Sequence, residues 1–224
     1  MQRPLPLYVG EYYHVYNRGV EKRDIFIQKK DWDRFHRLLY LANSTIPFRF
    51  RDLENQPLNN IERGSTLVAI GAYVLMPNHF HILVKEINSN GLSNFMEKLT
   101  TGYSMYFNKK YERVGPLFQG RFKAAHIDND EYLKYLYAYI HLNPIKIIDP
   151  DWKEVGIKNE RQALQHIENY QHSSYPDYDS ATREVSSILT KNEFPEYFSK
   201  PHSFKTYIND CLNWQSWHGR SSVL

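Results

Sequence analysis

Apolar and polar positions change period along the first 147 residues, and this pattern predicts a mixed α and β architecture. Stretches that alternate or are rich in β-favouring residues indicate strands, and apolar residues at spacings of three and four indicate helices. The predicted strands are residues 12–18, 66–75, 79–84 and 117–124, and the predicted helices are residues 31–42, 91–111 and 131–142. The order is therefore strand, helix, strand, strand, helix, strand, helix.

This order predicts the α+β class, with a ferredoxin-like βαββαβ antiparallel sheet and one added helix. The two central strands form a hairpin through the turn at Pro77-Asn78. Residues 44–65 lack periodicity and are expected to form a long loop. Beyond residue 147 only residues 161–170 and 204–214 have helical spacing. We therefore expect a domain over residues 1–147 and, over residues 148–224, a helical C-terminal extension packed on that core.

Composition narrows the class of protein without naming a function. The chain has 224 residues, of which 42% are hydrophobic, enough for a core. Its formal charge of +3 is too small to indicate a polyanionic partner by itself. The 18 Tyr, 12 Phe and 4 Trp include rings that can stack on bases, although most are expected to be packing residues. The single Cys211, the lack of a membrane-spanning apolar run and the N-terminus without a signal-peptide core predict a cytoplasmic protein.

The third predicted strand carries the first candidate for chemistry, the pair His79 and His81 on either side of Phe80. Side chains alternate across a strand, so the two imidazoles share one face and can reach a single divalent cation. The alternative is that His79 is a turn residue beside Asn78 and His81 an ordinary solvent-facing strand residue. The pair alone leaves both interpretations open.

The last predicted core helix, residues 131–142, carries a second candidate. Tyr139 and Asn143 are four residues apart and therefore neighbours on one helix surface, with Tyr135 preceding them on that face. A phenol has a pKa of about 10, so it is a weak nucleophile until a metal or base favours the phenolate. The alternative is that Tyr139 packs and that Asn143 caps the helix before Pro144.

Three separate motifs together resemble one family. They are Met76-Pro77-Asn78-His79-Phe80-His81, Gly115-Pro116-Leu117-Phe118-Gln119-Gly120-Arg121-Phe122-Lys123 and Tyr139-Ile140-His141-Leu142-Asn143-Pro144. In this order they resemble the REP-associated tyrosine transposases, in the single-tyrosine branch of the HUH superfamily of single-strand DNA nucleases and transposases. The resemblance spans residues 12–146, and three ordered motifs are more specific than the histidine pair alone.

The resemblance implies a metal-dependent DNA strand transferase, and hence a transposase active in DNA recombination. His79, His81 and Asn143 would hold Mg²⁺ or Mn²⁺, and the ion would polarise the scissile phosphate. Relatives outside this branch commonly carry Gln at the third position. Tyr139 would attack the phosphate and leave a 5′-phosphotyrosine and a free 3′-hydroxyl. The implied substrate is single-stranded DNA that bears a REP-like palindromic hairpin.

Basic residues around these motifs are candidates for contacts with DNA phosphates, although any one of them alone is better explained as an ordinary solvated charge. Arg121 is the strongest choice, because Gly120 before it lets a backbone come close. The full set of candidates is Arg18, Lys109, Lys110, Arg113, Arg121 and Lys123.

Two other classes of function fit the same fold. One is a hairpin-binding module for DNA or RNA whose nuclease activity has lapsed, and the other is a metal-free ferredoxin-like domain that serves protein assembly. The family resemblance favours a bacterial, nucleoid-associated protein with no membrane partner, which acts as a monomer or a homodimer.

Overall fold

The sheet at the centre of the fold has four antiparallel strands in the order β2-β3-β1-β4. The computed structural model describes residues 6–179, 183–198 and 202–212. The strands are β1 (Tyr12–Arg18), β2 (Val68–Met76), β3 (His79–Glu86) and β4 (Lys123–Ile127). Helix α1 (Lys29–Leu41) follows β1, and α3 (Gly91–Lys110) follows β3. This is the βαββαβ connection and strand order of a ferredoxin-like sheet, so the predicted α+β fold is confirmed.

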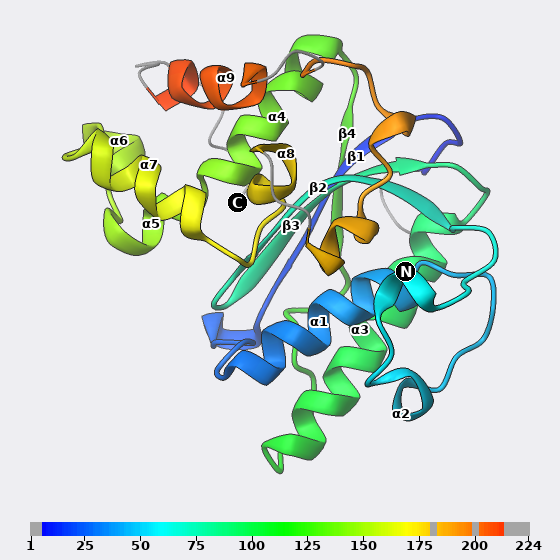
Figure 1. Ribbon diagram of the computed structural model, residues 1–224. Helices are drawn as coiled ribbons and strands as arrows, with labels where there is room; N and C mark the ends of the chain where they lie inside the picture. The colour runs from blue at the N-terminus through cyan, green and yellow to red at the C-terminus, as the bar shows by residue number, and fades with distance from the viewer. Residues whose placement is uncertain (1–5, 180–182, 199–201, 213–224) are drawn as a thin grey trace.

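Both faces of the sheet are covered, because its strands have apolar side chains on both sides. Helices α1 and α3 lie on one face, and α4 (Asp130–Leu142) lies on the other (Figure 1). Phe80, Ile82 and Val84 of β3 pack in the α1–α3 core. Leu83 of the same strand packs in the α4 core. The alternation of β3 therefore assigns even-numbered residues to one core and odd-numbered residues to the other.

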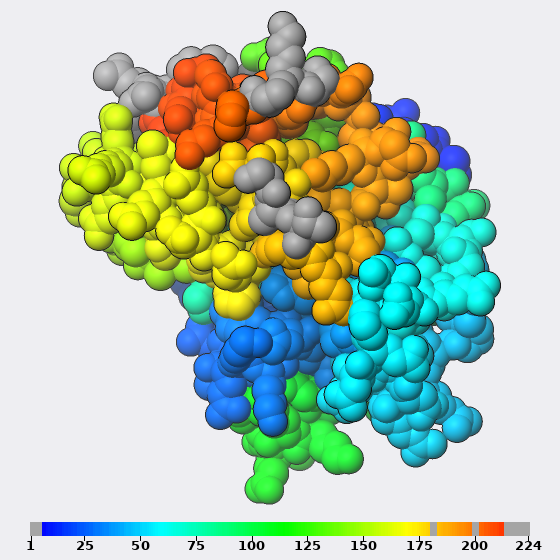
Figure 2. Space-filling model, in the orientation of Figure 1, coloured from blue at the N-terminus to red at the C-terminus, as the bar shows by residue number. Residues whose placement is uncertain are grey.

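The segment beyond residue 147 packs over α4 and along the outer edge of β2. It contains α6 (Trp152–Val155), α7 (Glu160–Asn169), α8 (Tyr175–Asp179) and α9 (Ser203–Leu212), after the short α5 (Ile145–Ile148). Two short 3₁₀ helices, η3 (Glu184–Ile188) and η4 (Lys191–Glu193), lie between α8 and α9. In the space-filling view these residues, coloured yellow to red, form one continuous surface with the blue and cyan segments (Figure 2). None of the helices described is both long and apolar enough to cross a membrane.

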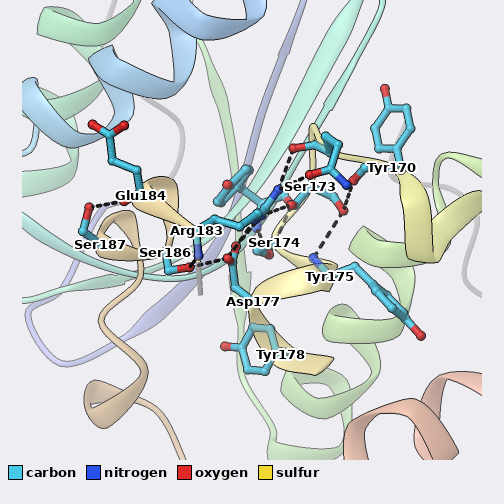
Figure 3. Close-up of polar contacts among 12 residues, drawn as sticks. Tyr170, Ser173, Ser174, Tyr175, Asp177, Tyr178, Arg183, Glu184, Ser186 and Ser187 are labelled. Atoms are coloured by element: carbon cyan, nitrogen blue, oxygen red, sulfur yellow. Dashed lines mark hydrogen bonds and ion pairs between the residues drawn. The ribbon is translucent and has the colours of Figure 1, made fainter. Parts of the chain in front are cut away.

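A buried ion pair holds part of this segment together. Arg183 donates to both carboxylate oxygens of Asp177, and it also donates to the backbone carbonyls of Gln171 and Ser173 (Figure 3). Beside this cluster the amide of Ser174 donates to the carbonyl of Tyr73 in β2 (3.0 Å). The C-terminal segment is therefore hydrogen-bonded to the edge strand as well as packed against the sheet.

The predicted fourth strand, residues 117–124, is the main local error. β4 begins only at Lys123, and the preceding residues form a loop. Gly115 and Gly120 have φ values of 94° and 91°, which turn the chain out of an extended path. Leu117 and Phe118 are buried in the α1–α3 core, so their apolar character reflects loop packing and not strand alternation.

Smaller differences concern the long loop and the last helix. The predicted loop over residues 44–65 contains a short helix, α2 (Phe50–Leu53), and a 3₁₀ turn, η2 (Leu58–Asn60). Another 3₁₀ turn, η1 (Val20–Lys22), follows β1. The last predicted helix is described to Leu212, and residues 213–214 lie outside the described part of the chain.

The side chain of Asp31, at the start of α1, is completely buried. Its hydrogen bonds connect the start of α1 to the end of α3. Burial raises the pKa of its carboxyl, but hydrogen bonds from Lys110, Tyr111 and two backbone amides outweigh this effect and lower the pKa overall. Its five donors are the Lys110 ammonium (2.6 Å), the Tyr111 hydroxyl (2.7 Å), the Tyr106 hydroxyl (2.9 Å), and the amides of Gln28 (2.8 Å) and Ile27 (2.9 Å). Asp31 is therefore a structural anchor of the α1–α3 layer.

We expect Asp31→Asn to lower the free energy of unfolding by about 2–4 kcal/mol at neutral pH, because a buried charge-assisted network loses its acceptor. Urea denaturation measures the change. The matched control is Asp33→Asn, because the ion pair of Asp33 with Lys29 is exposed. This substitution should change the free energy of unfolding by less than about 1 kcal/mol. A depressed carboxyl pKa stabilises the fold above about pH 4, and that contribution is lost as the pH falls further. If the difference in the free energy of unfolding between wild type and Asp31→Asn did not become smaller at acid pH, this assignment would be contradicted.

Candidate active site

The two histidines of β3 lie side by side on the face of the sheet that α4 covers. His79 and His81 have the same parity as Leu83, and their ring centroids are 5.1 Å apart with the ring planes perpendicular. His81 is completely buried and His79 is half-buried. The alternative that His81 is an ordinary solvent-facing strand residue is therefore wrong.

The hydrogen bond at Nδ1 leaves Nε2 of His79 available, and one tautomer of the His14–His81 pair does the same for His81. His79 Nδ1 lies 2.6 Å from Asn78 Oδ1, an acceptor, so the Nδ1–H donates and Nε2 keeps its lone pair. His81 Nδ1 lies 2.8 Å from Nε2 of His14, and His81 Nε2 has no hydrogen-bond partner among the described residues. When His81 Nδ1–H donates to His14, the second Nε2 lone pair is free as well. Such donors from Nδ1 are typical of histidines that bind a metal through Nε2.

His14 of β1 is a site residue that the sequence analysis missed. It is buried, and its ring stacks on that of His81 with centroids 4.9 Å apart. In the sheet, His14 pairs with Leu83, so it lies diagonally across from His81 on the same face. The alternation of residues 12–18 placed His14 on one face of a strand, but only the register with β3 shows which residues it meets.

The imidazoles are held in their neutral form. Burial lowers the pKa of His14 and of His79 to about 3, and it lowers the pKa of His81 well below its ordinary value. The charged side chains that add to this effect are all cations, namely Arg18, Lys146 and Lys153. Neutral imidazole is the form that binds a metal ion, so this environment suits ligation.

Helix α4 brings Tyr139 against the histidines. Its ring centroid lies 5.5 Å from that of His81 and 5.5 Å from that of His14, in edge-to-face contact with each. Burial, and then the nearby Tyr135, raise the pKa of the Tyr139 hydroxyl, whereas a hydrogen bond with the Asn143 side chain lowers it in part. The phenol is protonated at neutral pH, so it needs help from its surroundings to act as a nucleophile.

Asn143 is the C-terminal cap of α4, and it is buried. Its Nδ2 donates to the backbone carbonyl of Tyr139 (2.7 Å), which satisfies one of the free carbonyls at the end of the helix. The capping function considered as the alternative is thus present, and it leaves the amide oxygen as the atom that a metal would use. Within the described residues, no group of three or more His, Cys, Asp or Glu side chains is placed to hold a metal. A metal ligand function for Asn143 stays a prediction.

The candidate DNA contacts fall into two groups. Arg18 pairs with His79 across the sheet, and the loop before β4 is tied to that end of β1 by a hydrogen bond from Gln119 N to the Arg18 carbonyl (2.8 Å). Arg121 and Lys123, both exposed, follow in this loop and at the start of β4. These three residues therefore lie at the end of the sheet where β3 begins.

The other three candidates lie at the far end of α3, which projects beyond the sheet (Figure 1). Lys109 is exposed. Lys110 is bound to the buried Asp31, and Arg113 donates to Asn108 (2.8 Å). Lys110 and Arg113 thus already have partners within the protein, which makes them weaker candidates for DNA contact than Lys109.

A second missed residue comes from α6, in the C-terminal segment. The ammonium of Lys153 lies 4.3 Å from the ring centroid of Tyr139. Burial, and then the charge of Lys146, lower the pKa of Lys153 to about 8. No motif in the sequence marks this lysine, because its position depends on how the C-terminal segment folds back over α4.

A comparison with models of protein families agrees with the motifs. A family model described as "Transposase IS200 like" matches residues 59–143, which include β2, β3, α3, β4 and α4. A solved structure of a REP-associated tyrosine transposase bound to a REP hairpin is 13% identical, with 82% of this chain and 93% of that chain covered and a TM-score of 0.49. The tRNA(His) guanylyltransferase of Saccharomyces cerevisiae is 10% identical, with 91% and 86% covered and a TM-score of 0.39. Neither structure indicates a function by itself, and no curated protein matches the chain.

We expect His14→Ala to weaken Mn²⁺ binding by roughly 10- to 100-fold, because His81 loses the partner that orients its ring. His14→Gln, whose Oε1 can accept the same Nδ1–H, should recover most of the affinity. Electron paramagnetic resonance of free Mn²⁺ gives the affinity directly. The matched control is His126→Ala, since His126 lies in β4 and pairs with Glu11. Equal Mn²⁺ affinities for His14→Ala and wild type would show that His14 does not orient a metal ligand.

Proposed function

We propose that the chain, whose residues 59–143 match a family model described as "Transposase IS200 like", is a single-tyrosine DNA strand transferase. It acts on single-stranded DNA that carries a palindromic hairpin of the REP type, and it cuts and rejoins this strand through a tyrosine-linked intermediate. The observation that carries the proposal is the contact of the Tyr139 ring with His81, whose centroids lie 5.5 Å apart.

Tyr139 is the proposed nucleophile. Its Oη attacks the scissile phosphorus, a P–Oη bond forms, and the bond from phosphorus to the 3′-oxygen breaks. The phenolic proton leaves to solvent, and the 3′-oxygen takes a proton from solvent to become a hydroxyl. The products are a 5′-phosphotyrosine and a free 3′-hydroxyl. Attack of a 3′-hydroxyl on the phosphotyrosine reverses the bond changes and rejoins a strand, so no external energy source is needed.

A divalent metal, Mg²⁺ or Mn²⁺, fits the donor set. The lone pairs at Nε2 of His79 and His81 and the amide oxygen of Asn143 would hold it. When bound, the ion supplies a Lewis acid that polarises the scissile phosphate. Because all of these groups and Tyr139 belong to one chain, the proposal needs only a monomer, and a homodimer would not have to exchange α4.

The DNA strand is proposed to run over the end of the sheet where β3 begins. Arg18, Arg121 and Lys123 gather there, and their charges suit contacts with phosphates. The proposal that this DNA carries a hairpin rests on the resemblance of the three motifs to REP-associated transposases.

We expect Tyr139→Phe to abolish the covalent protein–DNA adduct without weakening hairpin binding by more than about twofold, since the change removes only one hydroxyl. The assay incubates the protein with Mn²⁺ and a labelled hairpin oligonucleotide that has single-stranded flanks. A denaturing gel then reveals the adduct, and fluorescence anisotropy gives the affinity.

The matched control for the nucleophile is Tyr135→Phe, because Tyr135 lies one turn earlier on α4 with its ring centroid 6.3 Å from that of Tyr139. This variant should still form the adduct. An adduct that survives in Tyr139→Phe would assign the nucleophile elsewhere. Tight binding of wild type without any adduct, in either metal, would favour a hairpin-binding module over an enzyme.

We expect Arg121→Ala to weaken hairpin binding and to lower the slope of log affinity against log salt by about one, as the loss of one phosphate contact predicts. Anisotropy titrations at several salt concentrations measure both quantities. The matched control is Arg51→Ala, because Arg51 lies in α2 beside Asp52. An unchanged salt slope in Arg121→Ala would remove this arginine from the DNA path.

A further inference from the structure

The segment that follows the family-matched residues supplies a cation to the site. Lys153 of α6 points its ammonium at the ring of Tyr139, with Nζ 4.3 Å from the centroid. The family match ends at residue 143, so this lysine lies outside it. Such a position beside the proposed nucleophile is where a phosphate would have to arrive.

Packing fixes the backbone that carries Lys153. Its neighbour Trp152 is 2% exposed and belongs to the α4 core. The carbonyl of the buried Asp149 accepts from Trp152 N (3.3 Å), and its carboxylate accepts from Lys158 N (3.0 Å). Gly156, with a φ of 86°, caps the end of α6. Lys153 is therefore held near Tyr139 by a folded turn.

The charged side chains that act on the site are mainly positive. Lys153, Lys146 and Arg18 all act on the pKa of His79, and each is positive. Glu154 acts on Lys153 in the opposite sense, but the net effect lowers the pKa of Lys153 to about 8, so most molecules carry the charge at neutral pH. A site with this surplus of positive charge is suited to an arriving phosphate.

We propose that Lys153 binds a non-bridging oxygen of the phosphate that Tyr139 attacks, and that it stabilises the negative charge that develops there during strand transfer. This inference rests on the proposed function and adds a substrate-binding residue to it. The bond changes are those already described for Tyr139. Lys153 keeps its proton throughout, and its contribution is electrostatic.

A purely structural use of Lys153 is the competing explanation, since a cation over a tyrosine ring also stabilises packing. The two explanations differ in one respect. A phosphate contact depends on the negative charge of the phosphate, whereas a packing contact does not. A methylphosphonate linkage removes that charge from the DNA and leaves the protein unchanged, so it separates them.

The experiment compares wild type, Lys153→Met and Lys153→Arg in single-turnover adduct formation with Mn²⁺. On the natural linkage, Lys153→Met should be slower by roughly 10²-fold, and Lys153→Arg should recover most of the rate. When the linkage that Tyr139 attacks is a methylphosphonate, wild type and Lys153→Met should react at the same rate within a factor of about two. The matched control is Lys134→Met on α4, because Lys134 also lies over an aromatic ring, 5.1 Å from the centroid of Tyr207. It should behave as wild type on both linkages.

A second measurement does not depend on turnover. In the Tyr139→Phe background, Lys153→Met should weaken binding of the hairpin by about fivefold, and this loss should vanish when one linkage in the single-stranded flank is a methylphosphonate. The methylphosphonate is placed at each flanking linkage in turn. A loss that persists at every position would overturn the inference. A charge-dependent loss in binding, together with no adduct from wild type, would overturn strand transfer and still support the contact between Lys153 and phosphate.

Discussion

The site depends on the strict alternation of β3 between two buried faces. Phe80, Ile82 and Val84 must lie in the α1–α3 core, and a register shift by one residue would bury the wrong set. This constraint directs His79 and His81 to the opposite face, under α4, without any interaction that involves the histidines themselves. The apolar residues on one side of β3 thus position the two histidines on the other side, and the pairing with β1 adds His14 to the same face.

The groups so assembled are buried or half-buried, and they are in their neutral forms. His14, His79 and His81 are neutral because burial and nearby cations lower their pKa, and Tyr139 is a protonated phenol because burial raises its pKa. A buried nitrogen such as His81 Nε2, which finds no hydrogen-bond partner in the described part of the chain, typically costs about 1–3 kcal/mol. The large apolar cores on both sides of the sheet offset such a cost. Local instability of this kind is common where a protein must receive a ligand.

Much of this arrangement is visible in the sequence, because it follows from local periodicity. The parity of His79 and His81 and the four-residue spacing of Tyr139 and Asn143 fix which side chains share a face. What the sequence lacks is long-range pairing. His14 meets His81 only through the register of β1 with β3, and Lys153 reaches Tyr139 only through the fold of the C-terminal segment. The same limit explains why Lys110 was a candidate for DNA contact: its ion pair is with Asp31, a residue far away in the sequence. The fourth strand was misplaced for a local reason, since the φ values of Gly115 and Gly120 bend an apolar stretch into a loop.

The C-terminal segment is therefore more than a cover for α4. One hydrophobic core joins side chains of β2, α4, α7 and α9, so this layer and the sheet share their buried surface. Hydrogen bonds from Leu75 N to the His172 carbonyl and from Ser174 N to the Tyr73 carbonyl bind the layer to the edge of β2, and the Asp177–Arg183 pair links α8 to the first residue before η3. These contacts keep α6 against the end of α4, where Lys153 meets Tyr139. The three sequence motifs end at Pro144, whereas the cation that contacts Tyr139 comes from a segment that no motif marks, because packing and not local sequence brings it there.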